Sequence, residues 1–310
     1  MRIAVTGSAS HLARVAIPRL LAHPQVTRVI GIDLRPATFR HARFESHVMD
    51  IRSEAARDVL AGVDAVVHLA FVVMRSLLGR QRRDRELMRS LNVDGSQSVF
   101  SGAAAAGVRC LIHCSSASVY GWSEPNERLD EHAPFRSLPG FFYAEDKIRV
   151  ERLLDAFESS HPGMRIVRLR PHAILGPHAQ PILKRLATSR IYPLLPRPQP
   201  LIQCVHEEDV ADALLRALFE PTATGAFNLA TDDAESLRTI IQSQGFAIGL
   251  PLAALRALAS WSWWYGKDST DPSWVTGLRH SLVLDTTRAR HILQWAPSHD
   301  SMSSCIASMI

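Results

Sequence analysis

The sequence predicts an α/β fold in which helices cover both faces of a doubly wound parallel sheet. Short apolar runs alternate with longer helical patterns through the first half of the chain, which is typical of parallel βαβ units. Several of these runs are almost continuously apolar, as in DAVVHLAF at 64–71. Strands that are buried on both faces have this composition, whereas half-exposed strands alternate apolar and polar residues.

The expected elements of the first half follow one another without a long interruption. The apolar runs predict strands at 2–6, 27–33, 46–50, 64–71, 108–116 and 164–170. Apolar residues at helical spacing predict helices at 11–23, 54–60, 84–106 and 142–159. This alternation predicts a Rossmann-type, dinucleotide-binding domain over residues 1–170.

The second half is less regular and predicts a smaller subdomain. Residues 177–203 are rich in proline and predict a surface loop. Short elements are expected after it, at 203–205, 207–219 and 226–230. We expect parts of 200–232 to return to the first domain, and 171–310 to form mainly the substrate-binding subdomain. The apolar and aromatic segment 250–266 predicts a core or lid helix, with contact to a membrane surface as the alternative.

Composition excludes several classes of protein. Charged residues make up 21% and apolar residues 46% of the 310 positions, as in ordinary globular chains. The net charge is +5, but the basic residues are scattered, and the dense stretch 75–89 also contains Asp84 and Glu86. We therefore expect no nucleic-acid partner. No charge-free apolar run reaches 18 residues, so we expect no membrane span.

The cysteines and histidines predict neither a disulfide framework nor a metal site. The four cysteines show no Cys-x-x-Cys spacing and are expected to be reduced thiols: Cys110, Cys114, Cys204 and Cys305. The fourteen histidines are spread over unrelated elements. Since the N-terminus enters a strand at once, we expect no signal peptide and a cytoplasmic location.

The turn after the first strand predicts a nucleotide site. TGSASHLA at 6–13 joins that strand to a helix whose free N–H groups can bind a pyrophosphate. Asp33 ends the second strand, where it can accept hydrogen bonds from ribose hydroxyls and would repel a 2′-phosphate. NAD is therefore expected in preference to NADP, although Arg35 could serve NADP. The residues of the turn that we expect to contact the cofactor are Gly7, Ser10, His11 and Leu12.

A tyrosine and a lysine four residues apart predict proton chemistry. Tyr143 and Lys147 lie on one face of the helix expected at 142–159. An ammonium near a phenol lowers the pKa of the phenol, so the tyrosine can exchange a proton with a substrate oxygen while a hydride moves. The strand at 108–116 ends in serines, and Ser116 is the candidate to bind the same oxygen. Ser115 and Ser118 are the alternates.

Together these motifs resemble the extended short-chain dehydrogenase/reductases, the NAD-dependent epimerase/dehydratase group. The likeness covers almost the whole chain, and the sequence has points in common with the hydroxysteroid dehydrogenase-like branch. Further segments that carry it are DAVVHLA (64–70), NVDG (92–95), SSASVYG (115–121), RLRPHAILGP (168–177), VHEEDVADA (205–213), GAFNLA (225–230) and LQWAP (293–297).

The resemblance implies roles for matching residues. Tyr143 would be the acid/base, Lys147 would bind the nicotinamide ribose and lower the tyrosine pKa, and Ser116 would position the substrate oxygen. The adenosine end would be bound by Asp33, with Asp50 and Ile51 at the adenine edge. Further cofactor-binding residues would be Leu69, Ala70, Asn92, Pro171 and His172. The resemblance also implies a homodimer formed through the helices around 84–106 and 143–159.

The departures from the family pattern bear on the cofactor and the substrate. The second and third glycines of the TGxxGxxG turn are Ser10 and Ala13 here. Ser10 either weakens NAD binding or donates its hydroxyl to the phosphate. Sugar-nucleotide members carry polar residues where this chain has Ala173 and Ile202. An acidic pair that the 4,6-dehydratases carry is replaced by Ala117 and Ser118, which removes the acid and base for water elimination.

These observations predict an NAD(P)-dependent oxidoreductase that acts on a secondary alcohol or its ketone. The apolar stretches near 71–78 and 250–265 favour a bulky hydrophobic small molecule as substrate. A nucleotide-sugar epimerase is the first alternative, with Arg75, Arg80 or Arg82 as partners for its diphosphate. A catalytically silent NAD(P)-binding protein is the second alternative, which the altered glycine turn favours.

Overall fold

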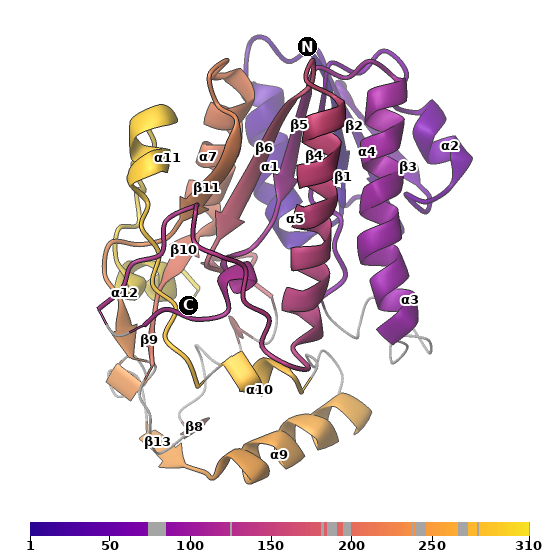
Figure 1. Cartoon of the computed structure of the whole chain (residues 1–310). Coiled ribbons are helices and arrows are strands. Elements are labelled where there is room, and N and C mark those ends of the chain that lie inside the picture. The colour runs from indigo at the N-terminus through magenta and orange to yellow at the C-terminus, as the bar shows by residue number, and fades with distance from the viewer. Residues whose placement is uncertain are drawn as a thin grey trace.

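Seven parallel strands form the central sheet of the computed structural model, in the order β11-β6-β5-β4-β1-β2-β3 (Figure 1). The structure describes residues 1–73, 85–124, 126–180, 183–184, 191–194, 200–236, 238–239, 246–265, 272–277 and 279–309; for 191–194, 247 and 263–265 it describes the backbone. The strands are β1 (Arg2–Thr6), β2 (Arg28–Asp33), β3 (Phe44–Val48), β4 (Ala65–His68), β5 (Cys110–Cys114), β6 (Arg165–Pro171) and β11 (Gly225–Leu229). The predicted doubly wound α/β fold is confirmed.

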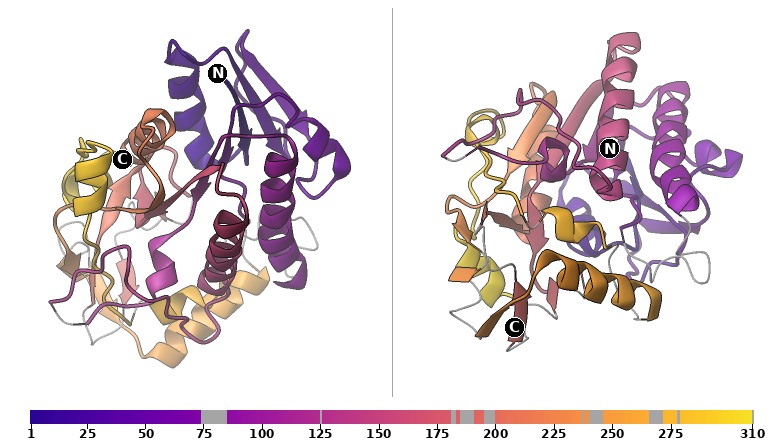
Figure 2. Two further views of the ribbon diagram at one scale, coloured as in Figure 1. Left: turned by 45° about the horizontal axis from the view of Figure 1, so that its top comes forward. Right: turned by 60° about the horizontal axis from the view of Figure 1, so that its bottom comes forward.

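Helices cover both faces of this sheet and create two hydrophobic cores (Figures 1 and 2). One core packs under α1 (His11–Ala22) and α7 (Glu207–Phe219), which also contact each other. The other packs under α4 (Gly95–Ala105) and α5 (Phe142–Ser160). The central strands β1 and β4 are buried along nearly their whole length, because both faces are covered. Their continuous apolar runs follow from this position.

Two predicted elements differ in detail from the structure. The strand predicted at 46–50 is β3, at Phe44–Val48. It is the edge strand and is largely exposed, so its sequence pattern is weak and pairing with β2 decides its bounds. The long helix predicted over 84–106 is interrupted: α3 (Arg85–Arg89) passes into a π-helical turn, η3 (Ser90–Asp94), before α4 begins.

The second half builds small sheets beside the carboxyl ends of the main strands. The strands are β7 (Ala173–Leu175), β8 (Ile191–Leu194), β9 (Leu201–Ile202), β10 (Cys204–His206), β12 (Glu235–Ser236) and β13 (Phe246–Gly249). The loop predicted over 177–203 is therefore wrong at β8 and β9. Within the described parts of the chain, β8 pairs with β13 alone, and such an edge strand tolerates a proline, here Pro193.

The remaining described helices are α2 (Glu54–Asp58), the 3₁₀ turn η4 (Ala117–Tyr120), α9 (Leu252–Tyr265), α10 (Trp274–Gly277), α11 (Thr287–Ile292) and α12 (Met302–Ala307). Figures 1 and 2 show α9 and α10 below the carboxyl ends of the strands, with α10 beside the start of α5. Among the described residues, none of the helices combines the length and the apolar character that a membrane crossing requires.

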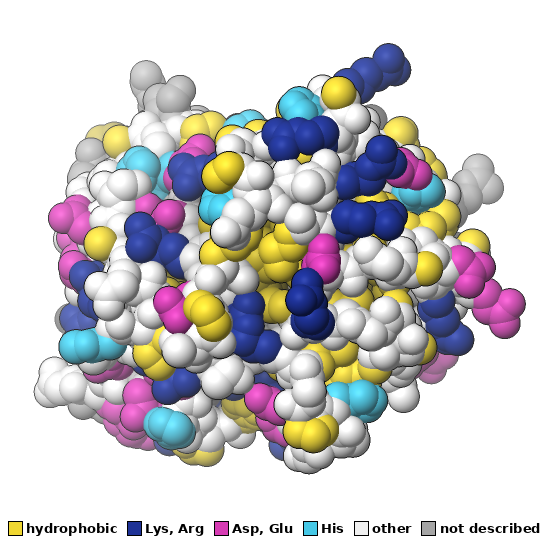
Figure 3. Space-filling view, turned by 90° about the horizontal axis from the view of Figure 1, so that it is seen from above, with side chains coloured by type: hydrophobic (Ala, Val, Ile, Leu, Met, Phe, Trp, Pro, Cys, Tyr) yellow, Lys and Arg dark blue, Asp and Glu magenta, His cyan; other side chains and the backbone are white. Residues whose placement is uncertain are grey.

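Charged side chains are mixed on the face that carries the N-terminus. Lys and Arg side chains there are interspersed with acidic, histidine and apolar side chains (Figure 3). Most of the basic stretch 75–89, including Arg75, Arg80 and Arg82, lies outside the described residues, as do the side chains of Trp263 and Trp264.

Candidate active site

Gly7 occupies a position in the nucleotide turn that no other residue fits. Its φ is +72°, in the left-handed region that favours glycine. A Cβ atom at Gly7 would lie 2.6 Å from the backbone nitrogen of Ala70. The turn therefore packs directly against the segment that follows β4, and the single glycine kept from the family turn is the one that this contact requires.

Ser10 has a local structural role that the sequence did not reveal. It is the N-cap of α1, and its hydroxyl accepts a hydrogen bond of 3.3 Å from the backbone N–H of Ala13. Ser, Thr, Asn and Asp stabilise helix starts in this way. The residue that replaces glycine therefore stabilises the start of α1, while its hydroxyl hydrogen can still donate to a ligand.

The start of α1 is an electropositive environment. Its first turn, which contains His11 and Leu12, has no acidic residue, and the helix dipole adds partial positive charge there. The pKa of His11 is lowered, mainly by burial and further by nearby cationic groups. The largest of these charge effects come from Arg14 and Arg35. The surroundings of this helix end suit an anionic group such as a pyrophosphate.

Asp33 and Arg35 lie together beside the glycine turn. One carboxylate oxygen of Asp33 accepts the backbone N–H of Ala9 at 3.0 Å, and the other accepts the backbone N–H of Arg35 at 3.0 Å. The Arg35 guanidinium donates to the carbonyl of Ala9 at 3.1 Å. Asp33 thus holds the turn in place, and each of its oxygens keeps a second lone pair for a ribose hydroxyl.

Asp50 and Ile51 lie at the next strand end along the sheet. The Asp50 carboxylate pairs with Arg52 at 2.6 Å, and this side-chain hydrogen bond is the main reason that the pKa of Asp50 is lowered. Ile51 is buried against Gly95, the first residue of α4. Arg52 was not among the predicted site residues, because nothing in the sequence indicated that it pairs with Asp50.

Asn92 fixes the segment that follows Leu69 and Ala70. It is buried in the π-helical turn η3. Its side-chain oxygen accepts the backbone N–H of Val72 at 2.7 Å, and its amide donates to the Val72 carbonyl at 3.2 Å. The amide also donates to Asp146 at 3.4 Å. Single π turns of this kind often occur at functional sites, and here the turn places Asn92 between β4 and α5.

The structure brings Ser116, Tyr143 and Lys147 together at the carboxyl end of β5. The Ser116 hydroxyl lies close enough to the Tyr143 phenol to lower the pKa of that phenol. Ser116 also caps η4 by accepting the backbone N–H of Ser118 at 3.2 Å. The Lys147 ammonium donates to the carbonyl of Cys114 at 2.7 Å. One strand end and one helix turn therefore position all three side chains.

The pKa values of Tyr143 and Lys147 differ from what the family resemblance implies. Burial raises the pKa of Tyr143, and the nearby Ser116 hydroxyl only partly opposes this. Burial lowers the pKa of Lys147 to about 8, although Cys114 and two carboxylates oppose that change. The implied lowering of the tyrosine pKa by Lys147 is not seen, because the ammonium is bound to a backbone carbonyl and lies 5.9 Å from the centre of the Tyr143 ring.

Three aromatic side chains that the sequence did not single out surround Tyr143. Phe71 meets its ring edge-on at 5.5 Å, and Trp274 lies 4.9 Å away at an angle of 33°. Phe141 is 6.2 Å away and also contacts Trp274. Phe71 directly follows Leu69 and Ala70, so its place beside two expected cofactor-binding residues is the signal that could have identified it. Trp274 comes from α10, and nothing in its local sequence connects it with a tyrosine 131 positions earlier.

Pro171 and His172 lie where β6 ends. His172 accepts the backbone N–H of Ala173 on Nδ1 at 2.8 Å, so Nε2 carries the proton and donates to the Leu282 carbonyl at 3.2 Å. Burial lowers the pKa of His172 to about 4. This residue is therefore a neutral side chain that links the end of β6 to the late segment around Leu282.

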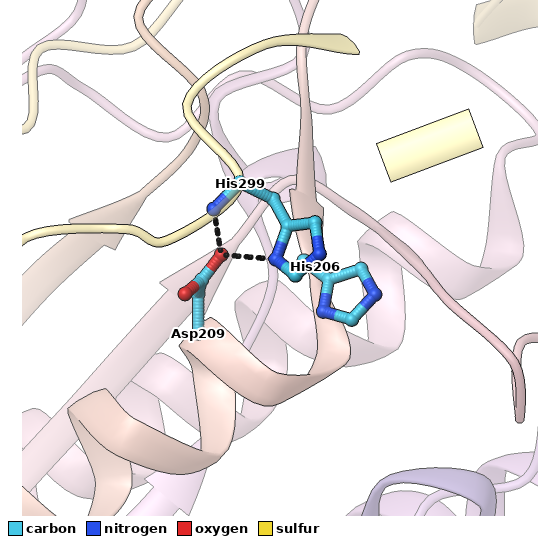
Figure 4. Close-up of side chains that lie close together, drawn as sticks. All are labelled: His206, Asp209 and His299. Carbon is cyan, nitrogen blue, oxygen red and sulfur yellow. Dashed lines mark hydrogen bonds and ion pairs between the residues drawn. The ribbon is translucent and has the colours of Figure 1, made fainter. Parts of the chain in front are cut away.

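His206, Asp209 and His299 form a cluster with the spacing of a metal site (Figure 4). The two imidazoles stack at 3.6 Å. His206 accepts the backbone N–H of Glu208 on Nδ1 and bonds to Ser308 through Nε2. Both oxygens of Asp209 accept backbone N–H groups, from residues 298 and 299. The ligand atoms of His206 and Asp209 have these protein partners, and the contacts join the C-terminal segment to α7.

Comparisons with known proteins agree with this architecture. The model of the "NAD dependent epimerase/dehydratase family" matches residues 3–230. An uncharacterized protein of Mycobacterium tuberculosis is 27% identical over 95% of this chain and 80% of its own length. The 3 beta-hydroxysteroid dehydrogenase/Delta 5-->4-isomerase of vaccinia virus (strain Western Reserve) is 29% identical over 49% of this chain and 44% of its own length.

A solved structure shows the same fold over the whole chain. The UDP-glucuronic acid 4-epimerase of Bacillus cereus, in complex with UDP-glucuronic acid and NAD, superposes with a TM-score of 0.77. The match covers 100% of this chain and 98% of that chain at 19% identity. The family model spans well over half of the 310 residues. The chain therefore belongs to the NAD dependent epimerase/dehydratase family, which confirms the expectation of an NAD-dependent enzyme of the extended short-chain dehydrogenase/reductase type.

Proposed function

We propose that the protein transfers a hydride between a nicotinamide ring and a secondary alcohol or its ketone, with a hydrophobic small molecule as substrate. One observation carries the proposal. Ser116, Tyr143 and Lys147 converge at the carboxyl end of β5, which is where ligands bind in open parallel sheets. The glycine turn and the start of α1 lie at the same edge, after β1.

The residues at this edge fit NAD. The start of α1 and its surrounding cations would hold the pyrophosphate, and Asp33 would hold the adenosine ribose. NAD, when bound, supplies the carbon that accepts or gives the hydride. Asp50, Ile51, Leu69, Ala70, Asn92, Pro171 and His172 are proposed to complete this binding surface.

Proton transfer falls to Tyr143 in this proposal. Its raised pKa keeps the phenol protonated, which is the form that donates to a carbonyl oxygen. Ser116, whose hydroxyl lies near the phenol, would orient that oxygen with a hydrogen bond. In the reverse direction the phenolate must form against the effect of burial, and we propose that the positive charge of Lys147 would favour it once substrate and cofactor are bound. Both directions need the same three side chains in one geometry.

An apolar substrate is supported by the surroundings of Tyr143. Phe71, Phe141 and Trp274 present three rings around it, and burial of apolar surface against them contributes about 25 cal/mol per Å². Ala173 and Ile202 offer no side-chain partner to a diphosphate, and an unpaired buried charge is costly. The similarity to a viral hydroxysteroid dehydrogenase, which covers 49% of this chain, supports the same class.

The alternative is a nucleotide-sugar epimerase, which keeps the hydride chemistry and lets the keto intermediate rotate. The family name includes epimerases, and the superposed Bacillus cereus enzyme is one. The proposed diphosphate partners Arg75, Arg80 and Arg82 lie outside the described residues, so the two candidates are separated by binding experiments.

We expect NAD to bind at least tenfold more tightly than NADP. The Asp33 carboxylate faces the glycine turn and would repel a 2′-phosphate, whereas the Arg35 guanidinium is bound to the Ala9 carbonyl. Isothermal titration calorimetry with both cofactors measures this difference. Asp33→Asn should reduce it. Tighter binding of NADP would show that Arg35 outweighs Asp33.

A thermal-shift panel with NAD present tests the substrate class. Ligands that bind only the folded state raise the melting temperature by mass action. We expect sterols or long-chain hydroxy and keto compounds to raise it, and UDP- or dTDP-sugars to leave it unchanged. Trp274→Ala should weaken the response to apolar compounds. Stabilisation by a sugar nucleotide, without any by the apolar compounds, would replace this proposal with the epimerase.

A further inference from the structure

Phe71 touches both members of the proposed catalytic pair. The Lys147 nitrogen lies 3.7 Å from the centre of the Phe71 ring, over its face. The same ring meets Tyr143 edge-on, at 5.5 Å between ring centres and 85° between planes. Lys147 is 3% exposed, and its hydrogen bond to Cys114 uses one of its three N–H donors. The aromatic face is thus a main contact of a buried ammonium.

The backbone beside Phe71 is held by hydrogen bonds between Asn92 and the next residue, Val72. Asn92 both accepts from and donates to the backbone of Val72, as described above. Asn92 itself is 1% exposed and bonds to Asp146, which lies on α5 between Tyr143 and Lys147. The position of the ring is therefore set by the same helix turn that carries the pair.

The electrostatic surroundings of Lys147 show why such a contact matters. Burial disfavours its charged form, and the ring face, which is electronegative, favours it. The groups that face Lys147 come from three elements: His68 on β4, His113 and Cys114 on β5, and Tyr143, Asp146 and Glu151 on α5. Glu151 is engaged by Arg170 at 2.8 Å, and Asp146 by Arg89 at 3.3 Å. These two carboxylates are therefore shared with arginines.

We propose that Phe71 is a positioning residue whose ring holds Lys147 in its ammonium form between the Cys114 carbonyl and Tyr143. The proposal rests on the function proposed above, in which Tyr143 and Lys147 act as a pair. It assigns to the residue after Leu69 and Ala70 a role in setting the charge state of the catalytic lysine.

Direct titration of Lys147 tests this role without any cofactor. The chain contains three lysines, Lys147, Lys184 and Lys267, so an NMR titration of the full chain with ¹³C-labelled lysine gives three signals that single substitutions assign. In Phe71→Leu we expect the pKa of Lys147 to fall by about 0.5–1.5 units, which corresponds to the loss of a desolvated cation–π contact. Phe71→Tyr should restore the original value.

Two further variants separate ring electrostatics from packing. Phe141→Leu also removes a ring that contacts Tyr143 but lies apart from Lys147 in the contacts above, and it should leave the lysine titration unchanged. Phe71→pentafluorophenylalanine keeps the shape and reverses the charge distribution of the ring, so it should lower the pKa of Lys147 at least as far as leucine does. An unchanged Lys147 titration in both Phe71 variants would overturn the proposal.

Activity adds a second readout that separates this proposal from the first. The alkaline limb of the kcat/KM profile should move to lower pH in Phe71→Leu by the same amount as the lysine pKa. If Tyr143→Phe kept its activity, the proposed function would fail whatever Lys147 does. A lysine pKa that shifts while the alkaline limb stays in place would show that Phe71 does not act through Lys147 in catalysis.

Discussion

Tyr143→Phe is expected to lower kcat by about 10²–10⁴, the usual contribution of a positioned acid or base. The phenol is the group that would exchange a proton with the substrate oxygen, and the Ser116 hydroxyl lies beside it. Phenylalanine keeps the contacts of the ring with Phe71 and Trp274. The fold and NAD binding should therefore persist. Steady-state kinetics together with calorimetric titration of NAD measure both expectations.

Tyr120→Phe is the matched control for this experiment. Tyr120 is also a buried tyrosine, and its hydroxyl donates to Asn228 at 2.7 Å and accepts from Arg170 at 2.8 Å. Its loss should reduce stability by about 1–3 kcal/mol and change kcat only slightly. Equal losses of activity in the two variants would point to general destabilisation. Near wild-type turnover in Tyr143→Phe would refute the catalytic role. If the native chain bound NAD but showed no turnover, the result would favour a catalytically silent binding protein.

Glu151→Gln is expected to reduce the free energy of unfolding by about 3–5 kcal/mol, the usual cost of removing one partner from a buried ion pair. Glu151 is fully buried and accepts from Arg170 at 2.8 and 3.0 Å and from Arg168 at 3.4 Å. A glutamine would turn an N–H donor toward a guanidinium that also donates. Denaturant unfolding monitored by circular dichroism measures the change.

Glu158→Gln provides the comparison for Glu151. It removes another carboxylate that pairs with Arg168, at 2.7 Å, but the Glu158 side chain is 39% exposed. Water can replace its interaction, so the expected loss is within about 1 kcal/mol. Similar effects of the two substitutions would contradict the view that the pair between α5 and β6 is a buried structural link.

The alternating order of strands and helices could be predicted from the sequence alone. The strands could be predicted from apolar runs because the central strands are buried on both faces, and such strands are apolar along nearly their whole length. The placement of Gly7 and Asp33 at the glycine turn, and of Tyr143 and Lys147 on one helix, could also be predicted. Each depends on chemistry within one turn or one helix face, so spacing along the chain carries the information.

The side chains that contact these residues come from distant segments, so they are known only from the folded structure. Phe71 and Trp274 meet Tyr143 from the segment after β4 and from α10, and no local pattern records contacts between such distant segments. The N-cap of Ser10, the interruption of the long helix at Asn92 and the strands within the proline-rich segment depend on hydrogen-bond partners that the fold supplies. The raised pKa of Tyr143 has the same origin: burial is a property of the folded surroundings, so neither the sequence nor the spacing of the pair could give it.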